Sequence, residues 1–600
     1  MGDNSVRFTG LDWSVLAVYF VGITAFGLWV SRKIRSSGGY FLGDRKLPWW
    51  IMVGQSFGTG THAENPVAQA GAVFKLGFAT IWYQWKNMLI TPFYWLLAPW
   101  YRRSERTTIG EMVEDRYGRR LAMVYTLFAI AYFVFNQGAM LKGAGKAISV
   151  ATGGQAVSPN EVVFAMTAAF IVYSFFGGLV ASAYTDFVQS FLIILLSVML
   201  IPAGLSRVGG FAGLHDSLPP DFFTLYSEVS GLTAFTIAML TVNGIVGIVA
   251  QPHMLSLSAT GNTERAGRIG QTYGTFVKRI CTIGWALTGL IVAALVVQQG
   301  MELPEGEAAF GFACREFLAP GLTGLMIACI LAANMSTCSN FMVNTGALFT
   351  RNFYREYINP GASDRQLLMM GRFSGLALTL LGILFAVAVE RVLDAFLFTE
   401  TIAALMGVMF LGGMLWKRAN RCGAWAATLG AFLSYYALNY LMSCRAGADS
   451  AAFSTLSDAF AELVERTRAG EMAAFLNTGV YKLVYPWKPG PFGWAMVVGF
   501  TALIIGSLLT RPEDGELIEQ FFDKQRRTTD EEPDAETGLR PLAAARGEEL
   551  VLLDLPGWFT AERWQGFFKR YREDLVGFVL AWFTVGFLLA LAWGILQIGK

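Results

Sequence analysis

The chain has 600 residues, of which 54% are hydrophobic and 15% are charged, and its mean hydropathy is +0.45. This composition excludes an ordinary soluble globular protein and is typical of a protein that crosses the bilayer many times. A formal net charge of +2, with acidic and basic residues intermixed, gives no basis for nucleic-acid binding.

Apolar runs of about 20 residues predict an all-α polytopic membrane protein with about fourteen membrane-spanning helices. Each run is long enough to cross the hydrocarbon core of a bilayer. We expect the spans near residues 13–31, 48–73, 79–100, 121–146, 160–182, 184–205, 230–255, 273–298, 318–349, 371–389, 394–416, 422–442, 487–510 and 573–597.

Basic residues divide the connecting loops into two sets. The loops after the first and third expected spans are rich in arginine and lysine, whereas the alternate loops hold nearly isolated basic residues such as Lys75 and Arg207. By the positive-inside rule the rich loops face the cytoplasm. The expected number of spans is even, so we expect both termini outside, in the extracellular or periplasmic space, and a multi-pass protein of the plasma (inner) membrane.

The same pattern predicts six regions along the chain. Residues 1–47 are expected to form a peripheral helix and a cytoplasmic loop, and residues 48–443 a transport core. Residues 444–486 are expected to form an extracellular loop with an amphipathic piece at Phe453–Glu465. A peripheral helix at 487–510, a cytoplasmic connector at 511–574 with a flexible Arg526–Asp534, and a last transmembrane helix at 575–600 complete the chain.

The second expected span is interrupted near its middle. Glycine permits a helix to unwind and proline removes a backbone donor, and both occur here, at Gly58, Gly60 and Pro66. Unwound backbone at membrane depth occurs only where it lines a cavity or is buried in protein. The break therefore predicts a transport site with free carbonyl groups, and a simple proline kink is the alternative. The polar residues at the break are Thr59, Thr61, His62, Glu64 and Asn65.

The span at 318–349 carries a polar stripe in its second half. Ser336, Asn340 and Asn344 are spaced at i, i+4 and i+8, and therefore share one helix face, with Ser339 beside them. Thr337 lies about 100° round the axis from Ser336. Hydroxyl and amide oxygens are ligands for a hard cation, and interhelical hydrogen bonding is the alternative.

Further ionisable residues fall inside the expected spans. Lys86, Asp186, Lys278 and Glu400 are costly at that depth and are functional candidates for that reason. The structural alternatives are that Asp186 caps the start of its helix, that Lys278 extends to the cytoplasmic interface, and that Glu400 pairs with an unidentified partner.

Nothing in the sequence predicts an enzyme or an organic cofactor. No Ser/His/Asp set, metal-ligand spacing or pair of acids stands out, and the six cysteines show no CxxC pattern. Most cysteines are expected to be packing residues, although Cys314 and Cys444 could pair on an oxidising side.

Several ordered motifs resemble the sodium:solute symporter family of sugar, proline, pantothenate, iodide and sialic-acid transporters. The likeness extends over about residues 11–430. Its motifs are YFLGDRKLPWW (Tyr40–Trp50), TTIGEMVEDRYGRR (Thr107–Arg120), FFGGLVASAYTDFVQ (Phe175–Gln189), AQPHMLS (Ala250–Ser256), MSTCSNFMVNTGALFTRNFY (Met335–Tyr354) and LWKRANRCGA (Leu415–Ala424).

The resemblance implies a leucine-transporter-type fold. This fold has two inverted five-helix repeats, which would comprise the second to sixth and the seventh to eleventh spans. One helix would precede the repeats and others would follow them.

The resemblance also implies one sodium site and raises a second. The first would use carbonyl oxygens of Gly58, Thr61 and Ala333 and the hydroxyls of Ser336 and Thr337. The second, found in some branches, would use Asp186, Ser339 and Asn340, where Asn340 replaces the usual serine.

The substrate residues implied by the resemblance follow the sugar-transporting branch less closely. That branch has SAEQ in its broken helix where this chain has HAEN, so the candidates are His62, Glu64 and Asn65. Further candidates are Gln84, Asn243 and Lys278, while Val246 replaces an aromatic gate residue. The expected solute is a small polar molecule, sugar-like or zwitterionic.

The leading hypothesis is sodium-driven solute uptake by alternating access. A proton-coupled transporter that uses His62 and Glu64 as its relay is the nearest alternative, and a substrate-gated channel or sensor of the same fold is another. The expected partners are the solute, sodium and the lipid bilayer, with no nucleic acid and no obligatory protein partner.

Overall fold

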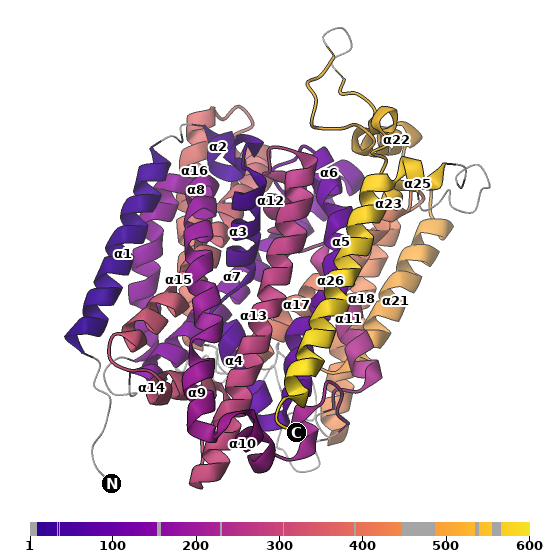
Figure 1. Cartoon of the computed structure of the whole chain (residues 1–600). Coiled ribbons are helices and arrows are strands. Elements are labelled where there is room, and N and C mark those ends of the chain that lie inside the picture. The colour runs from indigo at the N-terminus through magenta and orange to yellow at the C-terminus, as the bar shows by residue number, and fades with distance from the viewer. Residues whose placement is uncertain are drawn as a thin grey trace, which may run out of the picture.

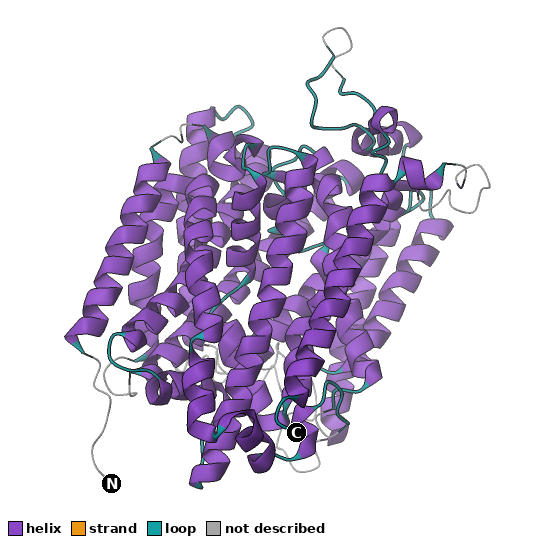
Figure 2. Cartoon of the chain, in the orientation of Figure 1, coloured by secondary structure: helices purple, strands orange, loops and turns teal. Residues whose placement is uncertain are grey.

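The computed structural model describes residues 9–32, 34, 36–152, 158–228, 231–303, 305–388, 392–446, 487–534, 539–554, 564 and 566–600, and none of these residues forms a strand. The fold is therefore helical throughout its described part (Figure 2). The main helices are α1 (Gly10–Ser31), α2 (Ser37–Leu42), α3 (Trp49–Gly60), α4 (Glu64–Leu76), α5 (Trp82–Arg103), α6 (Ile109–Tyr117), α7 (Arg119–Ala151), α8 (Pro159–Val198), α9 (Leu200–Val208), α10 (Gly210–Ser217), α11 (Ala234–Ile248), α12 (Met254–Ala259), α13 (Glu264–Gln299), α14 (Ala309–Phe317), α15 (Leu322–Leu348), α16 (Asp364–Ala388), α17 (Val392–Leu415), α18 (Arg421–Ala446), α21 (Pro489–Leu509), α22 (Gly515–Gln525), α23 (Val551–Asp554), α25 (Phe567–Arg570) and α26 (Arg572–Gln597).

Two helices are interrupted deep in the bundle. The expected break in the second span is confirmed, because α3 ends at Gly60 and α4 begins at Glu64. A second break separates α11 from α12, with Pro252 within it. The sequence predicted one continuous span there, so this second break is a correction. Both breaks leave backbone polar groups free of helical hydrogen bonds.

Helix α8 is really two helices that meet at Gly178. This residue has φ of 53° and ψ of −152°, which is a conformation that only glycine adopts readily. A Cβ added there would lie 2.5 Å from the Tyr40 carbonyl oxygen, so no larger residue fits. The break therefore lies before residue 183, where the sequence predicted the boundary between two spans.

Nine helices of the described residues are long and apolar enough to cross a membrane. The other five expected crossings correspond to α3 with α4, α5, the first half of α8, α11 and α18. Of these, α11 has only 15 residues, and α5 carries two prolines as well as Lys86, Arg102 and Arg103. The count of about fourteen crossings stays a prediction.

Helix α1 begins and α26 finishes at the same end of the bundle, while α2, α6 and α22 lie at the opposite end (Figure 1). We call this opposite end the basic end, because the arginine-rich loops after α1 and α5 lie there. A common end for both termini agrees with an even number of crossings.

Polar contacts hold residues 525–530 against the basic end. Glu264, at the start of α13, pairs with Arg103 at 2.8 Å and accepts a hydrogen bond from the Thr529 backbone at 2.9 Å. The Glu264 backbone in turn donates to Asp530 at 2.9 Å, and Arg103 donates to the Gln525 carbonyl at 3.2 Å. The expectation that Arg526–Asp534 is flexible stays a prediction, although Thr529 and Asp530 within it are bonded to Glu264. The amphipathic piece at 453–465 lies outside the described residues.

A buried ion pair holds α26 against the bundle. Arg268 of α13 lies 2.5 Å from Asp574, and both side chains are almost fully buried. Arg268 also donates to the Trp95 carbonyl at 3.1 Å, and the Trp95 indole donates to the Glu573 carbonyl at 2.9 Å. These contacts join α5, α13 and α26.

We predict that Asp574→Ala destabilises the protein by about 3–5 kcal/mol, because it leaves the Arg268 guanidinium buried without its partner. Thermal unfolding of the purified protein measures this loss. The control is Arg119→Ala, since Arg119 pairs with Glu114 at 3.2 Å but its side chain is 68% exposed; we expect less than about 1 kcal/mol there. Equal losses in the two variants would contradict the assignment.

Candidate functional site

Four of the five expected sodium ligands converge where the α3–α4 break meets α15. The Ser336 hydroxyl donates to the Gly58 carbonyl at 2.9 Å and lies 3.2 Å from the Ala333 carbonyl. The Thr337 hydroxyl lies 3.0 Å from the Thr59 carbonyl and 3.4 Å from that of Gly58. All of these residues are buried. The structure therefore gathers hydroxyl and carbonyl oxygens, the ligand type of a hard cation, at one point.

Thr61, the fifth expected ligand, lies in the same break. Its backbone N–H donates to the Gly58 carbonyl at 3.1 Å, and its side-chain hydroxyl is buried without a partner. The described residues contain no group of three or more His, Cys, Asp or Glu side chains that could hold a metal ion. An ion at this point would depend on neutral oxygens, which suits a monovalent cation better than a transition metal.

Asp186 lies behind the same stretch of α3, within the second half of α8. One of its carboxylate oxygens accepts from Thr59 at 3.1 Å and from Ser182 at 3.5 Å, and the other has no partner. Ser182 contacts Ser339 at 2.8 Å, so Asp186 reaches Ser339 through one hydroxyl. Because Asp186 is inside its helix, the alternative that it caps a helix start is wrong.

Asn340, the third residue of the expected second site, is turned along α15. Its side-chain oxygen accepts from Asn344 at 2.7 Å, while its amide nitrogen is buried without a partner. The structure therefore brings Asp186 and Ser339 together and leaves the Asn340 oxygen occupied by a neighbour one turn away.

A cavity of about 60 Å³ lies between the two helix breaks. This volume holds on the order of four water molecules. Its walls come from the α3–α4 break, the α11–α12 break, α5, α7, α13 and α17, and include Gly60, His62, Gln251, His253, Lys278 and Glu400. Two of the expected substrate residues, His62 and Lys278, thus face a common space.

Both ring nitrogens of His62 lie within hydrogen-bond distance of an oxygen atom. Nδ1 lies 2.6 Å from the Glu64 carboxyl and Nε2 lies 3.0 Å from the Thr59 carbonyl. A carbonyl only accepts, so Nε2 carries a proton.

The remaining expected substrate residues lie near the cavity without lining it. Asn65 bonds to His62 and Glu64, because its side-chain oxygen accepts from the His62 backbone at 3.2 Å and its amide donates to Glu64 at 3.2 Å. The backbone carbonyl of Gln84 accepts a hydrogen bond from the Arg279 side chain at 2.9 Å. Asn243 accepts from Lys86 at 2.9 Å.

The sequence did not predict the partners of the buried charges. Glu400 pairs with Lys86 at 3.4 Å and accepts from Gln251 at 2.9 Å, which identifies the partner that Glu400 lacked. Arg279 also lines the cavity and was missed. Its position next to Lys278, in the middle of a long apolar run and far from either end of α13, could have identified Arg279 as a candidate from the sequence.

The comparisons with known proteins agree with this geometry. A family model described as the sodium:solute symporter family matches residues 40–430. The chain belongs to the sodium:solute symporter family. Its members are transporters, so the chain is a membrane transporter rather than an enzyme, and sodium is the coupling ion that the family supports.

Two relatives of this symporter and one solved structure illustrate the relation. The sodium/glucose cotransporter of Vibrio parahaemolyticus is 26% identical over 453 residues, covering 69% of this chain and 82% of the relative. The osmoregulated proline transporter of Bacillus subtilis (strain 168) is 26% identical over 433 residues, covering 69% and 86%. A substrate-bound, outward-open Na⁺-coupled sialic acid symporter shares the fold, with a TM-score of 0.65, 17% identity, and coverage of 84% of this chain and 99% of that chain.

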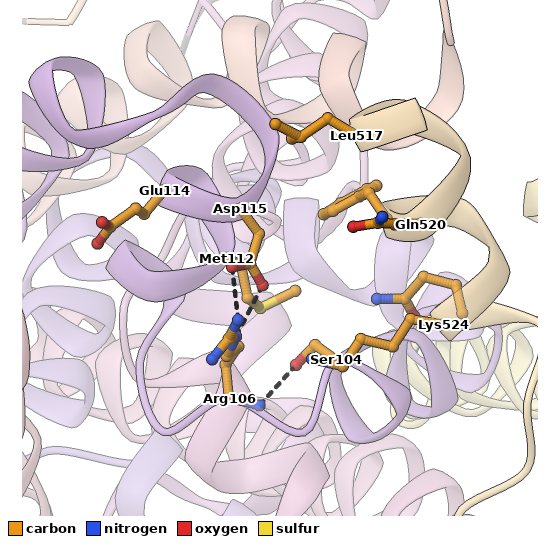
Figure 3. Close-up of a pocket in the computed structure, with 10 residues that line it drawn as sticks. Ser104, Arg106, Met112, Glu114, Asp115, Leu517, Gln520 and Lys524 are labelled. Atoms are coloured by element: carbon orange, nitrogen blue, oxygen red, sulfur yellow. Dashed lines mark hydrogen bonds and ion pairs between the residues drawn. The ribbon is translucent and has the colours of Figure 1, made fainter. Parts of the chain in front are cut away.

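The symporter has a second hollow, of about 380 Å³, at its basic end between α6 and α22 (Figure 3). Arg106 and Asp115 form an ion pair of 2.6 Å in it, and this hydrogen-bonded carboxylate raises the pKa of the Arg106 guanidinium. The Ser104 hydroxyl accepts from the Arg106 backbone at 3.3 Å. None of its described lining residues lines the cavity between the helix breaks.

We predict that Ser336→Ala combined with Thr337→Ala lowers the affinity for sodium by well over tenfold, because two ligand oxygens are removed and each contact to a charge contributes roughly 1.5–3 kcal/mol. Sodium-dependent thermal stabilisation of the purified symporter measures this affinity. The matched control is Thr337→Ser, which keeps the oxygen and should keep the affinity within a few-fold. An unchanged sodium response in the double variant would remove these residues from the site.

Proposed function

We propose that this symporter imports a small polar organic solute across the plasma membrane and couples each import to the entry of sodium by alternating access. The observation that carries the proposal is the meeting of two hydroxyls from α15 with carbonyls of the broken α3, beside a polar cavity at the same break. Sodium bound there would join α3 to α15 and fix the wall of the solute cavity, which is the coupling that symport requires.

The proposed architecture has two inverted five-helix repeats of the leucine-transporter type. The first would run from α3 to α9, and the second from α11 to α17. The two interrupted helices support this division, because each would be the first helix of its repeat. Helix α1 would precede the repeats, and α18, α21 and α26 would follow them, giving about fourteen crossings.

A second sodium ion at Asp186 is part of the proposal. The carboxylate is fully buried, and no ion pair joins it to a basic side chain in the part of the chain that the structure describes. A buried carboxylate without a cation is unfavourable. An ion between Asp186 and Ser339 would provide that cation, next to the first site on the same segment of α15.

Proton coupling is a second candidate, and the His62–Glu64 contact of 2.6 Å favours it, since the pair shares one movable proton. Uptake into proteoliposomes separates the two candidates. Sodium coupling requires that an inward sodium gradient drives uptake at equal pH on both sides, whereas proton coupling requires that a pH gradient drives it without sodium.

We predict that the wild-type protein moves two sodium ions per solute and that Asp186→Asn moves one, because the neutral amide no longer compensates the charge of the second ion. Parallel isotope fluxes of sodium and solute into proteoliposomes give this ratio. Thr185→Ser is the control, since Thr185 bonds only to carbonyls of its own helix. A wild-type ratio of one would remove the second site.

We predict that tags at both termini are reached by protease outside intact cells and that a tag inserted near Glu531 is protected. The loop charges predict that the basic end faces the cytoplasm, and α1 begins and α26 finishes at the other end. A protected C-terminal tag, with an accessible N-terminal one, would show that the number of crossings is odd.

A further inference from the structure

The buried charges around the cavity do not balance. The cavity and its immediate supports hold three basic side chains, Lys86, Lys278 and Arg279, and one acid besides Glu64, which is Glu400. Lys278 interacts electrostatically with all four of the other charged groups, Arg279, Glu64, Glu400 and Lys86, so they form one cluster. Each of these side chains is at most 9% exposed.

Two of the charges cancel locally. The Lys86 ammonium lies 3.4 Å from Glu400 and donates to Asn243 at 2.9 Å. Glu400 receives a further hydrogen bond from Gln251 at 2.9 Å. This lysine and this acid therefore neutralise one another and their remaining polar groups are bonded.

Glu64 has partners of its own. Its carboxyl lies 2.6 Å from His62 Nδ1 and accepts a hydrogen bond from the Asn65 amide at 3.2 Å. Among the described residues, no ion pair joins Glu64 to either of the two basic residues that remain.

Lys278 and Arg279 have only neutral acceptors. The Lys278 ammonium donates to the Gly60 carbonyl, and Arg279 donates to the Gln84 carbonyl at 2.9 Å. The Arg279 Nε is buried without any partner. Neither side chain forms an ion pair with an acid among the described residues, although both line the cavity.

Asp186, the other fully buried acid of this region, does not alter the balance. It does not line the cavity, and its carboxylate accepts hydrogen bonds from Thr59 of α3 and from Ser182 of α8. Three basic side chains, Lys86, Lys278 and Arg279, stand against two acids, Glu400 and Glu64, so the formal surplus around the cavity is one positive charge. A buried charge without a counter-charge is costly unless a ligand supplies one.

We propose that the transported solute is a small organic anion whose carboxylate is bound between Lys278 and Arg279. This proposal rests on the proposed function, and it replaces the uncharged or zwitterionic solute expected from the sequence. The planar guanidinium fork fits a carboxylate, and the anion completes the charge balance that the protein leaves open. Sodium and the anion then enter together, so that the two sodium ions per solute carry one net positive charge inward.

Paired probes of equal shape test the proposal. D-glucuronate is compared with D-glucose, and L-lactate with L-lactamide, by the thermal stabilisation that each gives the full chain in sodium. We expect each acid to bind at least about tenfold more tightly than its neutral partner, as one charge-assisted contact implies. The proposal is overturned if the neutral partners bind as tightly as the acids, or if neither acid binds while sodium still stabilises the protein.

Charge variants locate the effect. Arg279→Gln and Lys278→Gln should each reduce the preference for the acid by about tenfold, because each keeps a donor but removes a charge. Glu400→Gln should increase the preference, since Lys86 then adds its charge to the surplus. Arg119→Gln, far out at the basic end, should leave it unchanged. An acid preference that survives in both Arg279→Gln and Lys278→Gln overturns the assignment to these residues.

Failure of the anion proposal is distinguishable from failure of the proposed function. Sodium alone should stabilise the wild-type protein, and a variant that retains this response is folded. If sodium gives no stabilisation of the wild type, the proposed coupling is wrong. If sodium stabilises but the acids do not bind, only the solute class is wrong.

Discussion

The contact between the hydroxyls of α15 and the free carbonyls of α3 is the constraint on which the rest of the structure depends. A helix that stops at Gly60 exposes carbonyl groups which lipid does not solvate, and Ser336 and Thr337 supply the donors that they need. The same oxygens suit a sodium ion, which replaces the hydroxyl hydrogen bonds with coordination. The break, the proposed ion site and the wall of the cavity therefore share the same segment of α3.

The electrostatic design of the core separates two kinds of charge. On one side of α3, the buried carboxylate of Asp186 would be stabilised by a cation. On the other side, the buried basic side chains of Lys278 and Arg279 would be stabilised by an anion. The helix between them carries no charge of its own at Gly58–Thr61, so each ligand reduces the electrostatic cost of the other at short range. The coupling that we propose between the two ligands would rest on this arrangement.

The sequence predicted the features that depend on local chemistry and missed those that depend on distant contacts. Gly58, Gly60 and Pro66 are sufficient to predict the first helix break, and the spacing of Ser336, Asn340 and Asn344 predicts a polar stripe on α15. The second break was missed because the apolar run before Pro252 reads as one helix. The Lys86–Glu400 pair joins residues more than 300 positions apart, and no short-range pattern identifies such a partner. The prediction that Asp186 caps a helix start failed for a related reason. Its helix begins earlier, after Gly178, and the break there depends on packing against Tyr40, which is distant in the sequence.

Contacts at the basic end restrain the helix that carries Lys278 and Arg279. Glu264 begins this helix, α13, and it is bonded both to Arg103 at the end of α5 and to Thr529 and Asp530. Any tilt of α13 away from α5 at this end has to break that group of hydrogen bonds. A chain shortened after Leu509 would keep every residue that lines the cavity and yet lose the contacts of Thr529 and Asp530 that hold α13 in place.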